Sequence, residues 1–384
     1  MNNARLGDLI RPAGRRAGSQ SGLSVYSVTK HSGFVPSLEY FKKQVFSRDV
    51  ESYKLVEPGD FAYATIHLDE GSIGIAPRRG LISPMYTVFR ADDSLIEPAY
   101  LIRFLKSPRA LTYYSQLGNG GVHRRKAISL EALGSVSIPL PPRAEQRRIA
   151  AIMDRADMLR VKRRQVLAHL DILSQSIFLD LFGDPTTWSE HWPMGTIGDF
   201  AADVSYGTSA RSGFTGKWPI LRMGNITDHG RVDTTDLKYA NLTPEEIPKY
   251  TVRAGDLLFN RTNSAEKVGK AAVVRTHAPF GYAGYLIRVR FHDSSTAEFV
   301  SAYLASEHGR RTRRRLAKTA VNQANINASE LRRIRIAHPP ADLVRQFESR
   351  VMAIELQWDR AHQALAASNA LFESIQARAF RGKS

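Results

Sequence analysis

The sequence predicts an α+β protein made of two tandem α/β domains, each followed by a long helix. Two observations lead to this class. A set of short motifs occurs twice in the same order, and each copy ends in a proline pair followed by a long helical pattern. The length of 384 residues agrees, because single cores rarely grow beyond about 250–300 residues.

Four landmarks define the repeat. They begin with Leu6-Gly7-Asp8-Leu9, which is matched by Ile197-Gly198-Asp199-Phe200. The landmarks of the first copy and their counterparts in the second are 6–9 with 197–200, 54–61 with 250–257, 128–133 with 326–331, and 136–142 with 334–340. Between the landmarks the copies diverge strongly, as two domains with different targets would, although ordinary drift has the same effect.

Two long helices are expected, from Arg143 to Phe182 and from Asp342 to about Phe380. The first contains no glycine or proline, would be about 60 Å long, and ends at Gly183-Asp184-Pro185. Its apolar residues, at mostly three- and four-residue steps, are Ile149, Ile152, Met153, Ala156, Leu159, Val166, Leu170, Leu173 and Ile177. Those of the second are Phe347, Val351, Ile354, Trp358, Ala361, Leu365, Ser368, Phe372, Ile375 and Ala379.

Narrow stripes of this kind are typical of coiled coils. We therefore expect the helices to pack on each other as an antiparallel coiled coil with pseudo-two-fold symmetry. The alternative is that each helix covers the core of its own domain. The expected boundaries are 1–142 for the first domain, 143–182 for the first helix, 183–194 for a linker, 195–340 for the second domain and 341–384 for the second helix.

Within the domains, a mixture of strands and helices is expected. The clearest strand patterns are 23–28, 271–274 and 285–290, together with the strand before each proline pair. Segments 98–106 and 298–315 have helical patterns.

The charge balance favours a polyanionic partner. The chain has 54 Lys and Arg against 37 Asp and Glu, a formal net charge of +17. Because basic side chains set against phosphates release condensed counterions, nucleic acid is the favoured partner. The alternative is a basic surface that keeps the protein soluble or that binds an acidic protein.

There is no cysteine, no secretory signal at the start and no run approaching about 18 apolar residues. We therefore expect a cytoplasmic protein without a membrane partner.

Each copy also contains an acid-free basic stretch, 98–130 in the first and 308–329 in the second. A solvated charge run would usually include Asp or Glu, so these stretches favour one phosphate-binding surface per copy. Asn and Gln pair with adenine, and Arg pairs with guanine. The candidate DNA-binding residues of the first copy are Arg109, Asn119, His123, Arg124, Arg125 and Lys126. Those of the second are Arg222, Asn225, Asn260, Arg261, Asn263, Arg310, Arg311, Arg314, Lys318, Asn322, Gln323 and Asn325.

Motifs for catalysis are missing from the sequence. The proline pairs read Leu140-Pro141-Pro142-Arg143 and His338-Pro339-Pro340-Ala341, so neither offers the Asn or Asp that base methylation requires. Gly382-Lys383-Ser384 ends like a phosphate loop, but Ala377 stands where its first glycine belongs. The 11 histidines have no metal-ligand spacing. We expect no catalytic residue, metal or cofactor in this chain.

Taken together, the motifs resemble the specificity (S) subunit of type I restriction–modification systems. The matching segments in the first copy are 25–30 with Gly33-Phe34, 53–61, 71–74 and 83–86, and Pro141-Pro142 with 145–149. Those in the second copy are 206–208, 220–226 and 254–258. The second helix lacks the Glu145-Gln146 pair of the first, so the contacts of the two helices with partner subunits need not be the same.

The resemblance implies a fold of two target-recognition domains bridged by an antiparallel coiled coil. It also implies a non-catalytic role in reading a bipartite, asymmetric site on double-stranded DNA. Two DNA methyltransferase (modification) subunits with S-adenosylmethionine would dock on the helices. A restriction subunit with ATP-driven translocation and Mg²⁺ would join them. The alternatives are a specificity subunit of a modification-only or other two-part methyltransferase complex, a basic protein-binding scaffold, and an enzyme with a composite active site.

Overall fold

The structure is a computed structural model that describes residues 2–18, 20, 22–41, 43–47, 49–117, 127–264, 267–320 and 323–381. The chain divides into two compact units. Unit 1 consists of Met1–Lys162 and Leu365–Ser384, and unit 2 of Arg163–Ala364. Two long helices, α5 (Arg143–Phe182) and α12 (Ala341–Ala379), contribute a segment to each unit.

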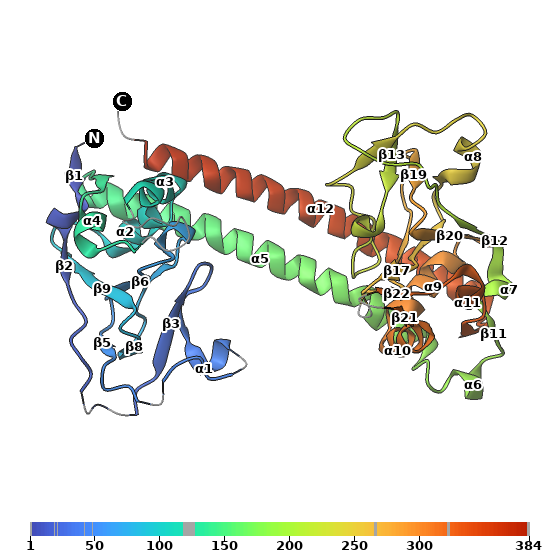
Figure 1. Ribbon diagram of the computed structural model, residues 1–384, viewed down its shortest axis with the longest axis horizontal. Coiled ribbons are helices and arrows are strands. Elements are labelled where there is room, and N and C mark those ends of the chain that lie inside the picture. Colours follow the sequence, from blue (N-terminus) through green and yellow to red (C-terminus); the bar gives the residue numbers. More distant parts are fainter. Residues whose placement is uncertain are drawn as a thin grey trace. The chain divides into compact units, whose positions relative to one another are not determined.

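Unit 1 contains two four-stranded sheets and one strand pair (Figure 1). The first sheet has the order β2-β9-β6-β7, and the second β4-β3-β8-β5, in which only β3 and β8 are parallel. The strands are β1 (Asn3–Arg5), β2 (Ile10–Pro12), β3 (Val25–Thr29), β4 (Gly33–Pro36), β5 (Lys54–Val56), β6 (Phe61–Ala64), β7 (Ile73–Ile75), β8 (Gly80–Ile82), β9 (Tyr86–Ala91) and β10 (Ser137–Pro139). The short helices are η1 (Leu6–Leu9), α1 (Ser37–Tyr40), η2 (Leu68–Glu70), α2 (Pro98–Leu105), α3 (Pro108–Leu117) and α4 (Leu130–Gly134).

Unit 2 repeats this topology. Its sheets have the orders β12-β20-β16-β18 and β14-β13-β19-β15, again with one parallel pair, β13 and β19. The strands are β11 (Met194–Thr196), β12 (Ala201–Tyr206), β13 (Trp218–Leu221), β14 (Lys238–Ala240), β15 (Thr251–Val252), β16 (Leu257–Asn260), β17 (Thr262–Asn263), β18 (Ala271–Val273), β19 (Phe280–Tyr282), β20 (Leu286–Phe291), β21 (Lys318–Ala320), β22 (Gln323–Asn325) and β23 (Arg335–Ala337). The short helices are α6 (Trp188–His191), α7 (Ile197–Phe200), η3 (Met223–Asn225), α8 (Ile247–Tyr250), α9 (Thr296–Ala305), α10 (Glu307–Leu316) and α11 (Ala328–Arg332).

The Gly-Asp landmark of each copy builds the same turn. Gly59 and Gly255 have φ values of +87° and +86°, a left-handed conformation that glycine adopts without steric cost. Asp60 accepts a hydrogen bond from Arg90 Nε at 2.7 Å, and Asp256 accepts one from Arg290 Nε at 2.9 Å. Both carboxylates are almost fully buried, so each arginine offsets a charge that would otherwise be costly. This shared turn explains why these residues recur while their surroundings diverge.

Each unit has its main core on the helix-covered face of its first sheet. In unit 1, residues of β6 and β9 pack against α2, the start of α5 and the end of α12. In unit 2, Phe178, Phe182, Trp188, Phe299 and Phe347 form an aromatic cluster with ring centroids 4.7–5.9 Å apart. Smaller clusters fill the space between the two sheets of each unit.

Segments of α5 and α12 contact each other within each unit. All ten apolar positions predicted on α12, from Phe347 to Ala379, are buried or half-buried. On α5 the prediction was partly wrong, because Ile152, Leu159, Val166 and Leu173 are 37–51% exposed. The positions that are covered include Ile149, Met153, Ala156, Arg160, Arg163, Leu167, Leu170, Ser174, Ile177 and Leu181.

Those covered positions alternate steps of four and three, and they include two arginines. Arg160 lies with its guanidinium carbon 4.3 Å from the ring centroid of Phe372, and its Nε donates to Asn369 Oδ1 at 2.8 Å. Arg163 donates to the carbonyl oxygen of Ala364. A count of apolar residues misses such positions, because the stems of long basic side chains are buried while their heads find polar partners.

Two further expectations changed in unit 2. The helix expected over 298–315 is two helices, because Ser306 is extended (φ −64°, ψ 161°) and its Oγ caps α10 by accepting from Gly309 N at 3.1 Å. A three-stranded sheet of order β17-β22-β21 was not expected at all. Within the described residues, no helix is long and apolar enough to cross a membrane.

Candidate nucleic-acid interface

The three-stranded sheet of unit 2 brings together predicted residues that are far apart in the sequence. In its register Thr262 faces Asn325 on β22, and Asn325 also faces Lys318 on β21. The amide of Ile326 donates to the carbonyl of Arg261 at 2.9 Å, which extends the pairing toward β16. The backbones of Asn260, Arg261, Asn263, Lys318, Gln323 and Asn325 therefore meet in one place.

Polar groups without partners gather there. Asn260 is fully buried, and neither its side-chain oxygen nor its nitrogen has a hydrogen-bond partner among the described residues; the same holds for Oδ1 of Asn325. A buried polar group left unpaired costs about 1–3 kcal/mol. Natural folds tolerate that cost mainly where a ligand or water completes the pairing. This is therefore a candidate binding site.

An arginine and a tyrosine lie beside these amides. The guanidinium carbon of Arg261 is 4.7 Å from the ring centroid of Tyr206, which is 40% exposed. The Tyr206 hydroxyl accepts from the backbone of Ala328 at 3.0 Å, so the ring is held from α11. Sequence reasoning named Tyr206 only as part of a motif, because a single exposed tyrosine carries no pattern of its own.

Helix α10 supplies positive charge in the same unit. Arg310, Arg311, Arg314 and Arg315 are exposed, while Arg313 is buried and donates to the carbonyl of Val268 at 2.9 Å. Burial, together with the charges of Arg310 and Arg314, lowers the pKa of Arg313 to about 10. Glu307, the acidic residue of the helix, lies 3.6 Å from Arg311. An anion such as a phosphate would relieve this uncompensated charge.

Asn225, Arg222, Arg109 and Asn263 also have hydrogen-bond partners inside the protein. Asn225 is buried, accepts from the backbone of Arg222 at 2.9 Å and donates to the carbonyl of Asp233 at 2.7 Å. The Arg222 side chain pairs with Asp236 at 3.0 Å. Arg109 donates to the carbonyl of Phe380. These contacts of Asn225, Arg222 and Arg109 stabilise the fold, and contact of these residues with DNA stays a prediction. Asn263 Oδ1 accepts from the amide of Ser264 at 2.9 Å, which shapes the turn after β17.

Other predicted residues fall where less is described. Asn119, His123, Arg124, Arg125, Lys126 and Asn322 lie outside the described residues.

In unit 1, Thr65 occupies the position that Arg261 has in unit 2. The amide of Ile128 donates to the Thr65 carbonyl at 3.0 Å, the same bond that joins Ile326 to Arg261. Both residues follow the landmark glycine by the same six positions, and His67 and Asn263 match in the same way. Sequence reasoning did not select Thr65 or His67, although their fixed offset from the landmark was a usable signal.

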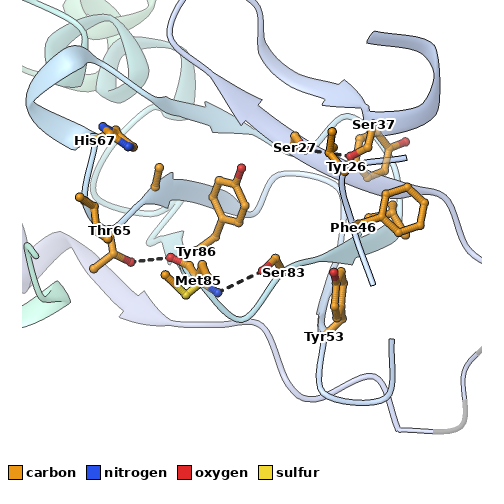
Figure 2. A pocket seen from close by; sticks show the side chains of 14 residues that line it. Tyr26, Ser27, Ser37, Phe46, Tyr53, Thr65, His67, Ser83, Met85 and Tyr86 are labelled. Atoms are coloured by element: carbon orange, nitrogen blue, oxygen red, sulfur yellow. Dashed lines mark hydrogen bonds between the residues drawn. The ribbon is translucent and has the colours of Figure 1, made fainter. Parts of the chain in front are cut away.

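A cavity of about 330 Å³ lies next to Thr65 and His67 in unit 1 (Figure 2). Thr65 Oγ1 donates to the Met85 carbonyl at 2.7 Å, and the hydroxyls of Ser27 and Ser37 are 2.8 Å apart. Aromatic rings from Tyr26, Phe46, Tyr53 and Tyr86 line the remaining walls. Unit 1 thus presents hydroxyls, an imidazole and rings where unit 2 presents amides and a guanidinium. Among the described residues, no group of three His, Cys, Asp or Glu side chains is arranged to hold a metal.

Comparison with known proteins adds independent information. No protein-family model matches the chain. It is 27% identical over 312 residues to the type I restriction enzyme EcoKI specificity subunit of Escherichia coli, covering 76% of this chain and 66% of that protein. It is 26% identical, with the same coverage, to the StySPI specificity subunit of Salmonella potsdam. The chain therefore spans just under two thirds of these relatives.

Solved structures support the fold. The type I S subunit of M. genitalium superposes with a TM-score of 0.59 at 12% identity, covering 100% of this chain and 96% of that one. A chain from a study of complex assembly and conformational transition of the type I R-M system has a TM-score of 0.58 at 19% identity, covering 99% and 97%. The named relatives support the identification of this chain as a specificity (S) subunit of a type I restriction–modification system, and the solved S subunit shares its doubled fold.

Proposed function

We propose that this chain reads a bipartite, asymmetric DNA sequence, with one half-site bound by each unit, and directs partner subunits to methylate and cleave. The observation that carries this proposal is the repeated frame with different side chains at matching positions. Thr65 and His67 stand in unit 1 where Arg261 and Asn263 stand in unit 2. Side chains with different donor and acceptor patterns read different bases.

The proposed organisation is the one the sequence predicts. Residues 1–142 and 195–340 form target-recognition domains, 143–182 and 341–384 are the helices, and 183–194 is the linker. The helices form an antiparallel coiled coil with pseudo-two-fold symmetry that sets the gap between the half-sites. The steps of four and three among the covered positions of both helices support this arrangement.

The proposed DNA contacts fall into two classes. Exposed Arg310, Arg311, Arg314 and Arg315 of α10 bind phosphates, and the group around Asn260, Arg261 and Asn325 reads base edges. Asn263, Lys318, Asn322 and Gln323 are further proposed DNA-binding residues of the second copy. In the first copy the proposed DNA-binding residues are Asn119, His123, Arg124, Arg125 and Lys126. Arg109, Arg222 and Asn225 are also proposed to bind DNA, in addition to the contacts they make within the protein.

The proposed partners are two methyltransferase subunits, which carry S-adenosylmethionine, and a restriction subunit that uses ATP and Mg²⁺. Exposed apolar residues on α5 offer surface for docking. In unit 2 a groove of about 310 Å³ is lined by Val166, Ile172 and Leu173. In unit 1 Met158 and Leu159 are more than half exposed. With chromosomal and invading DNA as the target, the complex works in the cytoplasm.

Sequencing methylated bases in host DNA, with and without this chain, tests the proposal. We expect one bipartite motif with a fixed gap to lose methylation when the chain is removed. Unchanged methylation would reject the role in methylation. The modification-only alternative predicts the same motif without cleavage of unmethylated DNA. The scaffold alternative predicts binding to duplexes without any sequence preference.

A further inference from the structure

A buried arginine of unit 2 is held by both long helices. Arg231 follows the turn between β13 and β14 and is only 8% exposed. Its Nε and Nη2 donate to the Glu355 carboxylate of α12 at 2.9 Å, and its Nη1 donates to Asp171 of α5. Its guanidinium also lies over the Trp358 ring, 4.4 Å from the centroid. We call Arg231, Asp171, Glu355 and Trp358 the Arg231 cluster.

Further bonds make the Arg231 cluster rigid. Trp358 Nε1 donates to Asp171 at 3.0 Å, so the two helices are joined to each other as well as to Arg231. Arg275, which follows β18, donates to Glu298 of α9 at 2.7 and 2.8 Å and reaches Glu355 at 3.4 Å. The cluster thus ties the segments after β13 and β18, together with α9, to one point on the helices.

Unit 1 has a corresponding device built from a different element. Arg103 of α2 donates to Asp154 of α5 at 2.6 Å and to Asp157 at 2.9 Å. Asp157 also accepts from Arg160, whose guanidinium stacks on Phe372 of α12. In unit 1, therefore, an arginine of the sheet-bearing domain lies between two carboxylates of α5. In unit 2 the corresponding arginine lies between one carboxylate of α5 and one of α12.

Arrangements of this kind fix geometry more than they add stability. Desolvation offsets much of the attraction in a buried ion pair, so a well-packed apolar contact of the same size usually stabilises the fold at least as much. An apolar contact tolerates rotation and sliding, but a guanidinium held by carboxylates on two sides does not, since its donors lie in one plane. The directional contacts join each sheet-bearing domain to its helices, so they resist a rotation of that domain on the helices.

We propose that Arg231 and Arg103 are positioning residues that hold each recognition domain at one angle on its helices, and that they thereby determine which gap between half-sites is accepted. The inference rests on the proposed function. It assigns to these two arginines a part in specificity without any contact with DNA.

The test uses the full chain and duplexes whose two half-sites, identified by methylation sequencing, are separated by the native gap or by one base pair more or fewer. Arg231→Met is combined with Asp171→Asn and Glu355→Gln, so that no buried charge of the cluster is left alone and Trp358 keeps an acceptor. We expect the preference for the native gap to fall by about tenfold. Affinity for a duplex with only the second half-site should stay within about twofold.

Glu145→Gln with Arg148→Gln is the matched control, because this pair lies 2.8 Å apart within α5 and, among the described residues, neither side chain forms an ion pair or hydrogen bond with a sheet-bearing domain. It should keep the full gap preference. An unchanged preference in the triple variant, or an equal loss on the single half-site, would overturn the proposal.

If the triple variant does not fold, Arg103→Gln, which alters a half-buried side chain, takes its place. We expect it to relax the gap preference in the same way, and an unchanged preference in that variant would equally overturn the proposal. Absence of any sequence preference in the unaltered chain would instead reject the proposed function, and this inference with it.

Discussion

The clearest test of the DNA interface removes two charges from α10. Arg314 and Arg315 are exposed, and neither forms an ion pair with a carboxylate in the part of the chain that the structure describes. Arg311 differs because it lies near Glu307, and Arg310 because its Nε donates to the Ala305 carbonyl. Replacing Arg314 and Arg315 by glutamine therefore changes charge with the least disturbance of the helix.

The expected size of the effect follows from counterion release. Each phosphate contact contributes about 0.9 to the slope of log affinity against log salt, so two lost contacts should reduce the slope by about 1.8. When the variant and the unaltered chain bind equally at about 1 M salt, this difference in slope makes the variant bind roughly 30-fold more weakly at about 0.15 M salt. The loss should be similar for specific and scrambled duplexes, since phosphates carry no sequence information.

Fluorescence anisotropy with a labelled duplex at several salt concentrations measures this slope. Arg350→Gln with Arg360→Gln is the control, because it removes two exposed charges of α12 that form no ion pair within the described residues. That variant should keep the slope of the unaltered chain. The reasoning is refuted if the α10 variant keeps its slope, or if both variants lose the same amount.

Three further predictions concern stability and the first half-site. Phe178→Ala should lower the free energy of unfolding by about 3–5 kcal/mol in urea denaturation, because Phe178 is fully buried against four other rings; Phe178→Leu, which leaves a smaller cavity, should lose clearly less. The hydrogen bonds from Ser295 lower the pKa of Asp293 below its ordinary value of 3.8, so its contribution is present above that pH and is lost as the pH falls through the folded value. Thermal unfolding of Asp293→Asn should accordingly show a weaker decline below pH 3.8 than the unaltered chain, and an identical decline would contradict this. Arg124→Ala with Arg125→Ala should weaken footprint protection of one half-site only; loss over both halves would show that the copies do not bind separately.

The doubled architecture was open to prediction because its landmarks are backbone requirements. Gly59 and Gly255 are needed for a left-handed turn, and Asp60 and Asp256 anchor the same arginine pairs, so these residues persist while neighbours change. The helix bounds followed from a long uninterrupted pattern. The covered face of α5 could not be predicted in the same way, because Arg160 and Arg163 occupy covered positions that a polarity scale assigns to solvent.

The candidate site was less accessible to sequence reasoning. The group around Asn260, Arg261 and Asn325 was selected by residue type, but only the pairing of β17 with β22 brings its members together. Asn225 was selected on the same grounds and holds a turn, because an amide that reads a base and one that caps a turn look alike in one sequence. Arg231 was not selected at all, since its role depends on carboxylates from two helices.

The end of α12 completes the core of unit 1. Phe380 is buried with its ring centroid 5.5 Å from that of Tyr100 and 5.4 Å from that of Phe104. During synthesis the ribosome must add the whole of unit 2, roughly 200 residues, before Phe380 emerges, which takes about 10–40 s at ordinary elongation rates. For that interval the N-terminal part of the nascent chain has an unfilled apolar site and depends on chaperones or on its own marginal stability. Premature termination anywhere in the second half would leave both units, and not only the later one, without a finished interior.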